Sequence, residues 1–289
     1  MRRYDVTMKG LTIGYPNRTV ATDLNAQVAP GRLTCLIGSN GAGKSTLLRT
    51  LAGLQPPIKG KVLLRELCKD TDLNIKTDCE RTDGKNVDKA NHTDGKQVDE
   101  TNRRNNRAGE TADEVIDIAR LDRRHMARLV AVVLTDRPDM RQLSVREVAA
   151  MGRMPYTGFF GRLNDEDRQV VDEALVRTGI GSYADRAVET LSDGERQKVM
   201  IAKALAQQTP VMILDEPTAF LDYPSKVEIL KLLRRLAHDT GRTILLSTHD
   251  LDLAAALGDR FLTLDGQLHD TSVEELKDYI RLAADTETK

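Results

Sequence analysis

The chain has 289 residues, a formal net charge of −1 and a hydrophobic fraction of 40%. A charge so close to zero argues against nucleic acid as a partner and against strong attraction to anionic lipid. The apolar fraction suffices for the core of one large or two modest domains. Every apolar run is much shorter than the roughly 18 residues of a membrane span, and Met1–Asp5 lacks the apolar core of a signal peptide.

The first part of the chain, residues 4–64, alternates apolar and polar residues and predicts antiparallel strands. The clearest segments are Val6–Tyr15, Asn25–Val28 and Lys61–Leu64. Between them lies the continuous apolar run Leu33–Ile37, which is typical of a buried parallel strand. The three cysteines of the chain are odd in number and lack metal-binding spacing, which indicates a reducing compartment.

A phosphate-binding loop is predicted directly after that buried strand. Gly38–Ser45 matches G-x-x-x-x-G-K-[ST], and Thr46–Leu54 has the pattern of a helix. Lys44 is expected to reach the β- and γ-phosphates of a nucleotide, and Ser45 to offer its hydroxyl to Mg²⁺. The alternative is a glycine-rich turn followed by Lys-Ser by chance. The predicted ATP-binding residues here are Gly38, Ser39, Asn40, Gly41, Ala42, Gly43, Lys44, Ser45 and Thr46.

The composition changes abruptly over residues 65–112, which are rich in Asp, Asn, Thr, Lys and Gly. The segment contains an internal repeat, Thr82–Asn91 against Thr93–Asn102, but no EF-hand pattern. It has too few large apolar residues to offset the entropy of ordering, so we expect a disordered insertion and assign it no function.

Order is expected to resume near Ala112–Ile118 and to lead into the strand Leu129–Leu134. Residues 136–195 then predict helices, near Val145–Met151, Asp165–Thr178 and Ser182–Val188. Ser192 and Glu195 form a capping box for a helix over Arg196–Gln207.

A second buried strand, Val211–Leu214, ends in Asp215 and Glu216. Carboxylates at the carboxyl end of a parallel strand suit a ligand site, so Asp215 is predicted to hold Mg²⁺ and Glu216 to act as general base. The alternative is ordinary surface capping. The rest of the chain predicts a helix, a strand, a hairpin and an amphipathic tail helix, at Ser225–Thr240, Thr243–Leu246, Phe261–Leu268 and Ser272–Ala284.

Leu191-Ser192-Asp193-Gly194-Glu195 resembles the LSGGQ signature of ATP-binding cassette (ABC) ATPases, with Asp193 and Glu195 where that family usually has Gly and Gln. The phosphate loop, the signature and the Asp-Glu strand occur in the family order. The resemblance implies an α/β fold of the P-loop NTPase class: an ABC-type cassette with a parallel sheet core, an antiparallel β subdomain and an inserted helical subdomain. In this scheme 1–135 and 196–268 form the nucleotide-binding core, 136–195 the helical subdomain and 269–289 a C-terminal tail.

The resemblance also implies roles for single residues. Tyr15 matches the aromatic residue that stacks on adenine, and Ser192 and Gly194 would face ATP bound by a second copy. Asp222 ends the segment that resembles the D-loop, which crosses to the partner, and His249 matches the histidine that contacts the γ-phosphate. The predicted catalytic residues are thus Lys44, Glu216 and His249.

The chain departs from the family after the strand that ends at Leu134. The family carries a Gln there that binds Mg²⁺ and signals to the membrane partner, whereas this chain has Thr135-Asp136-Arg137. Thr135 keeps an oxygen, so it is predicted to line the metal site with Ser45 and Asp215, with weaker coupling than Gln would give.

Met151–Gly161 contains a Gly-Arg-x-Pro-Tyr segment. In this respect the chain resembles the ABC ATPases of bacterial importers for iron–siderophores, haem and cobalamin, in which such a segment is typical of the helical subdomain. This implies a homodimer that uses ATP and Mg²⁺, works with integral-membrane permease subunits and indirectly with an extracytoplasmic substrate-binding protein, and lies peripherally on the cytoplasmic face of the inner membrane. An iron–siderophore cargo is the first expectation, and cobalamin or haem is the alternative. A soluble, non-transport ABC ATPase is the alternative from another class, and no residue here identifies the cargo.

Overall fold

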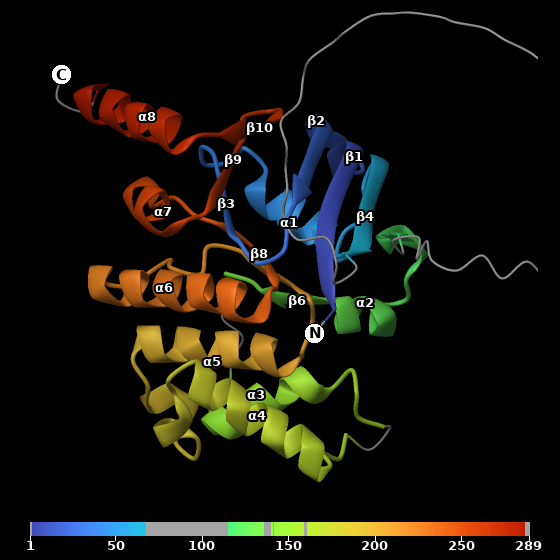
Figure 1. Ribbon diagram of the computed structural model, residues 1–289, viewed down its shortest axis with the longest axis vertical. Coiled ribbons are helices and arrows are strands. Elements are labelled where there is room, and N and C mark those ends of the chain that lie inside the picture. Colours follow the sequence, from blue (N-terminus) through green and yellow to red (C-terminus); the bar gives the residue numbers. More distant parts are fainter. Residues whose placement is uncertain (1, 68–114, 136–139, 141, 159–160, 287–289) are drawn as a thin grey trace, which may run out of the picture. The chain divides into compact units, whose positions relative to one another are not determined.

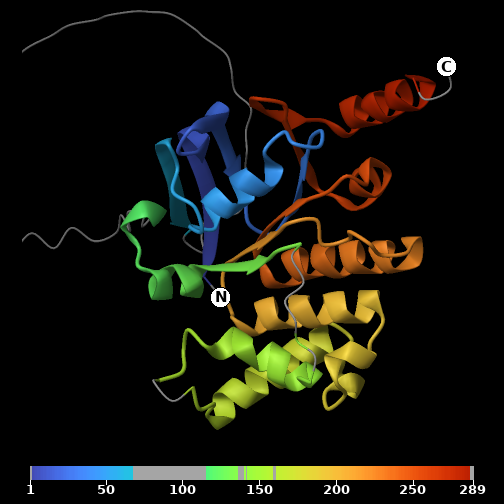
Figure 2. The same ribbon diagram turned by 180° about the vertical axis from the view of Figure 1, so that it is seen from behind.

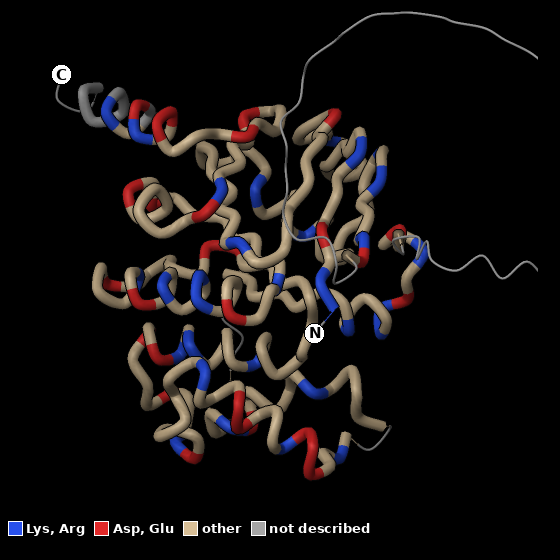
Figure 3. Tube along the Cα trace, viewed as in Figure 1, with Lys and Arg blue, Asp and Glu red and all other residues tan. Residues whose placement is uncertain are grey.

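The structure is a computed structural model that describes residues 2–67, 115–135, 140, 142–158 and 161–286. The predicted polar insertion over 65–112 lies outside the described residues, apart from 65–67, which end a strand. None of the helices in these ranges is long and apolar enough to cross a membrane. Acidic and basic residues are interspersed along the helices and strands (Figure 3).

The N-terminal part forms a four-stranded sheet in the order β2-β1-β4-β5. Its strands are antiparallel, and Val6 pairs with both Val28 and Leu64. Inward apolar side chains from these strands, such as Leu11 and Leu24, are fully buried. The predicted strands therefore exist, and they are longer than expected. Their bounds are β1 Arg3–Tyr15, β2 Arg18–Val28, β4 Lys59–Leu67 and β5 Val115–Asp117.

The second sheet has six strands in the order β10-β9-β3-β8-β7-β6. All neighbours are parallel except the β9–β10 hairpin. The central strands β3, β7 and β8 are buried along their whole length, which explains why they appear in the sequence as unbroken apolar runs. The bounds are β3 Leu33–Ile37, β6 Val130–Val133, β7 Val211–Leu214, β8 Thr243–Ser247, β9 Arg260–Leu264 and β10 Leu268–Thr271.

Helices cover the parallel sheet on both faces (Figures 1 and 2). On one face α1 packs between the two sheets, with Leu47 and Leu48 in a core shared with β1 and β8. On the other face Cys35 and Leu246 join a core built with α5, α6 and α7, beside which α3 and α4 pack. The helices are α1 Lys44–Leu51, α2 Arg123–Leu129, α3 Val145–Ala150, α4 Asp165–Arg177, α5 Asp193–Ala206, α6 Tyr223–Thr240, α7 Leu251–Leu257 and α8 Val273–Thr286.

The helix expected over Ser182–Val188 is wrong. Two short 3-10 turns, Gly181–Tyr183 and Val188–Thr190, stand there instead. The backbone between them bonds to another segment: the N–H of Val145 donates to Arg186 O at 3.0 Å, and that of Arg146 to Ala184 O at 2.8 Å. In these tertiary hydrogen bonds the main-chain oxygens of Ala184 and Arg186 accept from another segment, whereas in a continuous helix they would accept from residues of the same helix.

Gly152 permits the closest approach between the Met151–Arg153 turn and α5. A Cβ at this position would lie 2.1 Å from the main-chain oxygen of Lys203 and 3.1 Å from the Cβ of Ala206. Gly152→Ala is therefore expected to lower the free energy of unfolding by about 2–3 kcal/mol through overpacking, measured by urea denaturation. Gly158→Ala is the control, because its Cβ would meet nothing within 4 Å. Equal stability of the two variants would contradict this packing argument.

Candidate functional site

Three neighbouring strands bring the predicted motifs to one edge of the parallel sheet. β8 lies between β3 and β7, with Leu36 opposite Ser247 and Leu214 opposite Leu246. The phosphate loop follows β3, the two carboxylates follow β7, and His249 lies just beyond β8. The carboxyl ends of parallel strands meet at the same edge, where α/β proteins bind their ligands.

Three glycines of the phosphate loop, Gly38, Gly41 and Gly43, have positive φ, and at two of them a side chain would also clash. Gly38 has φ 154° and Gly43 has φ 103°. A Cβ on Gly38 would lie 2.4 Å from the main-chain oxygen of Leu264, and one on Gly43 would lie 2.3 Å from Cγ1 of Val20. No residue with a side chain fits either position without rearrangement. The loop runs directly into α1, whose N-terminus supplies the backbone N–H groups and positive potential that bind phosphate.

The Lys44 ammonium lies across this loop. Its Nζ donates to the main-chain oxygens of Gly38 at 2.8 Å and Ser39 at 3.0 Å. The residue is 5% exposed. Burial lowers the pKa of Lys44, and the nearby carboxylates of Glu216 and Asp215 oppose that shift. A buried cation held by loop carbonyls is poised to bind phosphate oxygens.

Asp215 is the centre of a small hydroxyl–carboxylate cluster. Its Oδ1 accepts hydrogen bonds from Ser45 Oγ at 3.1 Å and from Ser247 Oγ at 2.7 Å. Ser247 Oγ also accepts from the backbone N–H of Glu216 at 2.9 Å. No role was predicted for Ser247 from the sequence. The signal was available, because a hydroxyl at the end of β8 lies level with the residue just after β7 in this parallel pair.

Glu216 and His249 form the second pair of the site. Nε2 of His249 lies 2.5 Å from Oε1 of Glu216, within hydrogen-bonding distance. The backbone of Glu216 has φ 48°, a left-handed conformation that is uncommon for a residue with a side chain. Such strain persists only where the surroundings fix the conformation, and it is frequent at functional sites.

The phosphate loop, Glu216 and His249 line one cavity of about 290 Å³. Tyr15, the last residue of β1 and 48% exposed, lines it together with Arg18 and Val20 of β2. No role was predicted for Arg18, whose only sequence signal is its closeness to Tyr15 across a turn. The lining residues are Tyr15, Arg18, Val20, Asn40, Gly41, Gly43, Lys44, Ser45, Thr46, Glu216 and His249.

Three predicted ATP-binding residues lie elsewhere, at helix starts. Ser192 caps α5: its Oγ accepts from the N–H of Glu195 at 3.3 Å. Gly194 packs against the start of α6, where a Cβ would lie 2.8 Å from Ser225 Oγ. Asp222 caps α6, and its hydrogen bonds with Ser225 lower its pKa. None of the three lines the cavity, so their contact with nucleotide stays a prediction about a second copy.

Thr135 lies next to Asp215 but does not face the cavity. Its Oγ1 donates to the main-chain oxygen of Asp215 at 2.9 Å, and it is absent from the cavity wall. Its role as a metal ligand stays a prediction. The contact shows that Thr135 fixes the backbone that carries the Asp215 carboxylate.

Thr135→Ala tests that contact. A hydrogen bond of this kind contributes about 1 kcal/mol, so we expect ATP hydrolysis to slow about fivefold, measured as phosphate release. Thr240→Ala is the control, because its hydroxyl bonds to Leu236 O at 2.6 Å at the far end of α6. Unchanged hydrolysis and transport in the Thr135 variant would remove the residue from the site.

The donor set fits Mg²⁺ shared with a nucleotide. Ser45 and Asp215 supply hydroxyl and carboxylate oxygens, the ligands that Mg²⁺ prefers. Within the described ranges no three His, Cys, Asp or Glu side chains group closely enough to hold a metal. Mg²⁺ commonly binds through one or two protein oxygens together with substrate phosphates, and this site has that composition.

Comparison with known proteins places the chain in a family. The ABC transporter family model matches residues 21–219. The chain is 37% identical to the iron(3+)-hydroxamate import ATP-binding protein FhuC of Bacillus subtilis (strain 168), over 88% of this chain and 76% of that protein. It is 35% identical to the cobalamin import ATP-binding protein BtuD of Halobacterium salinarum (strain ATCC 29341), over 97% of this chain and 58% of that protein.

A crystal structure of a nucleotide-free ATP-binding cassette from an ABC transporter superposes with a TM-score of 0.71 at 17% identity, covering 97% of this chain and 96% of that one. A likeness at this identity supports the expected cassette fold. The chain belongs to the ABC transporter family.

Proposed function

We propose that the chain is the ATP-hydrolysing subunit of an importer for iron–siderophore complexes. The observation that carries the hydrolytic part is the cavity in which Lys44, Glu216 and His249 meet, with Asp215 against Ser45 behind it. The import part is supported by the 37% identity to a relative named for iron(3+)-hydroxamate import.

The chemistry follows from the positions of these groups. The γ-phosphate of ATP would lie between Lys44 and the N-terminus of α1, which balance its charge. Glu216 accepts a proton from the attacking water, and His249, 2.5 Å from that carboxylate, holds both in line with the phosphorus. The water oxygen bonds to phosphorus while the bond to the ADP oxygen breaks. Bound at Ser45 and Asp215, Mg²⁺ would supply further charge neutralisation, and Tyr15 would stack on adenine.

A second copy completes this site. Ser192, Gly194 and Asp222 stand away from the cavity of their own chain, at the exposed starts of α5 and α6. A capped helix N-terminus is an anion site, so Ser192–Gly194 suits the γ-phosphate bound by the other copy. ATP would then shift two copies toward a closed pair, and hydrolysis would release them.

The partners of the proposed importer are integral-membrane permease subunits, with a substrate-binding protein acting indirectly. The chain would lie peripherally at the cytoplasmic face of the membrane. Cobalamin is the alternative cargo, favoured by the 35% identity to a relative named for cobalamin import, and haem remains a further alternative. A soluble ABC ATPase without a transporter is the alternative from another class.

Co-purification separates an importer subunit from a soluble ATPase. Affinity-tagged chain, expressed in its own cell and extracted with mild detergent, is expected to retain one multi-span membrane protein in equal molar amount. The tagged chain should also remain with the membrane fraction before extraction. Recovery of the chain alone and entirely in the supernatant would favour the soluble alternative.

A further inference from the structure

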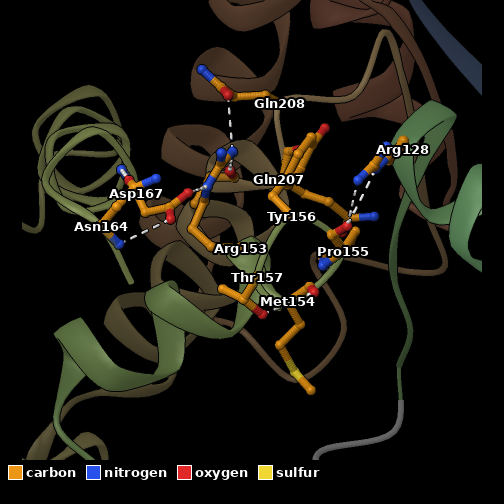
Figure 4. A network of polar contacts seen from close by, with 11 residues as sticks. Arg128, Arg153, Met154, Pro155, Tyr156, Thr157, Asn164, Asp167, Gln207 and Gln208 are labelled. Carbon is orange, nitrogen blue, oxygen red and sulfur yellow. Dashed lines mark hydrogen bonds and ion pairs between the residues drawn. The ribbon is translucent and has the colours of Figure 1, made fainter. Parts of the chain in front are cut away.

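The segment Gly152–Thr157 holds one end of α5 in place (Figure 4). Arg153 is 5% exposed and lies at the centre of the contacts. Its Nε donates to Asp167 Oδ1 at 2.9 Å, and its Nη1 donates to the main-chain oxygen of Ala206 and to Gln208 Oε1, both at 2.9 Å. A buried guanidinium is stable only when its donors are satisfied in this way.

Tyr156 forms the second contact with the same helix end. Its hydroxyl donates to the main-chain oxygen of Gln207 at 2.9 Å. Its ring lies between two guanidinium groups, at 4.1 Å from that of Arg153 and 5.2 Å from that of Arg128. Cations over an aromatic ring attract it, so the ring is fixed on both sides. Arg128 in turn donates to Pro155 O at 3.1 Å, which anchors the segment to α2.

The segment thereby joins three parts of the fold at one point. Asp167 belongs to the first turn of α4, where it forms a capping box with Asn164. Gln207 follows the last residue of α5, and its Nε2 donates to Ala127 O at 2.5 Å and to Val130 O at 3.2 Å, at the start of β6. The end of α5 is thus tied to α4, to α2 and to β6.

The opposite end of α5 carries Ser192–Gly194, and beyond Gln207 the chain enters β7, which ends at Leu214 just before Asp215. With 14 residues α5 is about 21 Å long. A tilt of about 5° at the tied end would therefore move the other end by about 2 Å. A displacement of that size is enough to break hydrogen bonds with a phosphate.

We propose that Arg153 and Tyr156 are positioning residues that set the angle of α5 and so place Ser192–Gly194 for the nucleotide of a second copy. This inference rests on the proposed two-copy ATPase. Neither residue lines the cavity around Lys44. Their replacement therefore changes how two copies meet and leaves the binding of ATP to a single copy unchanged.

The test compares Tyr156→Phe and Arg153→Lys with Arg146→Lys, each combined with Glu216→Gln to prevent turnover. Arg146 is the matched control, because its guanidinium pairs with Asp172 and Asp185, whereas Arg153 and Tyr156 bond to Ala206, Gln207 and Gln208 at the end of α5. Analytical ultracentrifugation with Mg-ATP gives the dimerisation constant, and calorimetry on dilute protein gives the ATP affinity of one copy. Thermal denaturation records stability.

We expect the dimerisation constant to weaken about fivefold for Tyr156→Phe and at least about tenfold for Arg153→Lys, since more hydrogen bonds are lost. ATP affinity of one copy should stay within about twofold for both, and the Arg146 control should match the parent in both measurements. If Arg153→Lys does not fold, Tyr156→Phe decides, because it keeps the ring between the two guanidinium groups.

Lower thermal stability with an unchanged dimerisation constant would overturn the inference and leave a purely structural role. Failure of the proposed function looks different: the Glu216→Gln parent itself would remain monomeric at saturating ATP. If the Glu216→Gln parent dimerises with ATP and the variants dimerise equally well, the positioning role is rejected but the proposed function is not.

Discussion

Replacing Glu216 with glutamine is expected to slow ATP hydrolysis about 10²- to 10⁴-fold, the range that a general base contributes. The change keeps the size of the side chain and its distance to His249 but removes the group that accepts a proton from water. Binding of ATP should be retained, because Lys44 and the phosphate loop are untouched. Phosphate release and nucleotide binding, measured on the same preparation, check both statements.

Glu173→Gln is the control for this experiment. Glu173 is an exposed carboxylate of α4, outside the cavity. The control should hydrolyse ATP at the unmodified rate. Turnover of the Glu216 variant within about threefold of that rate would mean that another group accepts the proton.

Replacing Lys44 with alanine is expected to weaken ATP binding about 30- to 150-fold. Loss of the charge-assisted hydrogen bonds to phosphate weakens binding by about 2–3 kcal/mol, and each 1.4 kcal/mol corresponds to about a tenfold change in affinity. Hydrolysis should fall below detection. Calorimetric titration with ATP and with AMP tests the cause, because AMP lacks the phosphates that Lys44 is predicted to bind.

Lys61→Ala, on the exposed side of β4, controls for loss of a lysine. The Lys44 variant should lose most of its preference for ATP over AMP, whereas the control should keep it. Equal loss of affinity for the two nucleotides would indicate general damage to the loop.

Much of the fold follows from local sequence patterns. The runs at β3 and β7 are continuous and apolar because both strands are buried on both faces, and their predicted bounds, Leu33–Ile37 and Val211–Leu214, are confirmed. The helix expected over Thr46–Leu54 ends earlier, at Leu51, because Gly53 has φ 66° and stops it.

Other features depend on contacts between distant segments. The turns on either side of Ala184 form because the main-chain oxygens of Ala184 and Arg186 accept hydrogen bonds from Arg146 and Val145. These donors are distant in the sequence, so no local pattern predicts the turns. The short helices α2 and α7 were not predicted either, since each has only seven residues and little periodicity. At the site, the phosphate loop and the carboxylates are predictable because they form sequence motifs. Ser247 reaches the site only because β7 and β8 pair in a parallel register that places it beside Asp215 and Glu216.

Uptake of labelled ferric siderophore tests the central claim most directly. The strain to use lacks this chain and is complemented either with the unmodified chain or with Glu216→Gln. The account predicts that uptake is lost on deletion, restored by the unmodified chain and not restored by the variant, while cobalamin and haem uptake stay normal throughout. Unchanged ferric siderophore uptake in the deletion strain would contradict the proposed cargo, and full restoration by Glu216→Gln would contradict the requirement for hydrolysis.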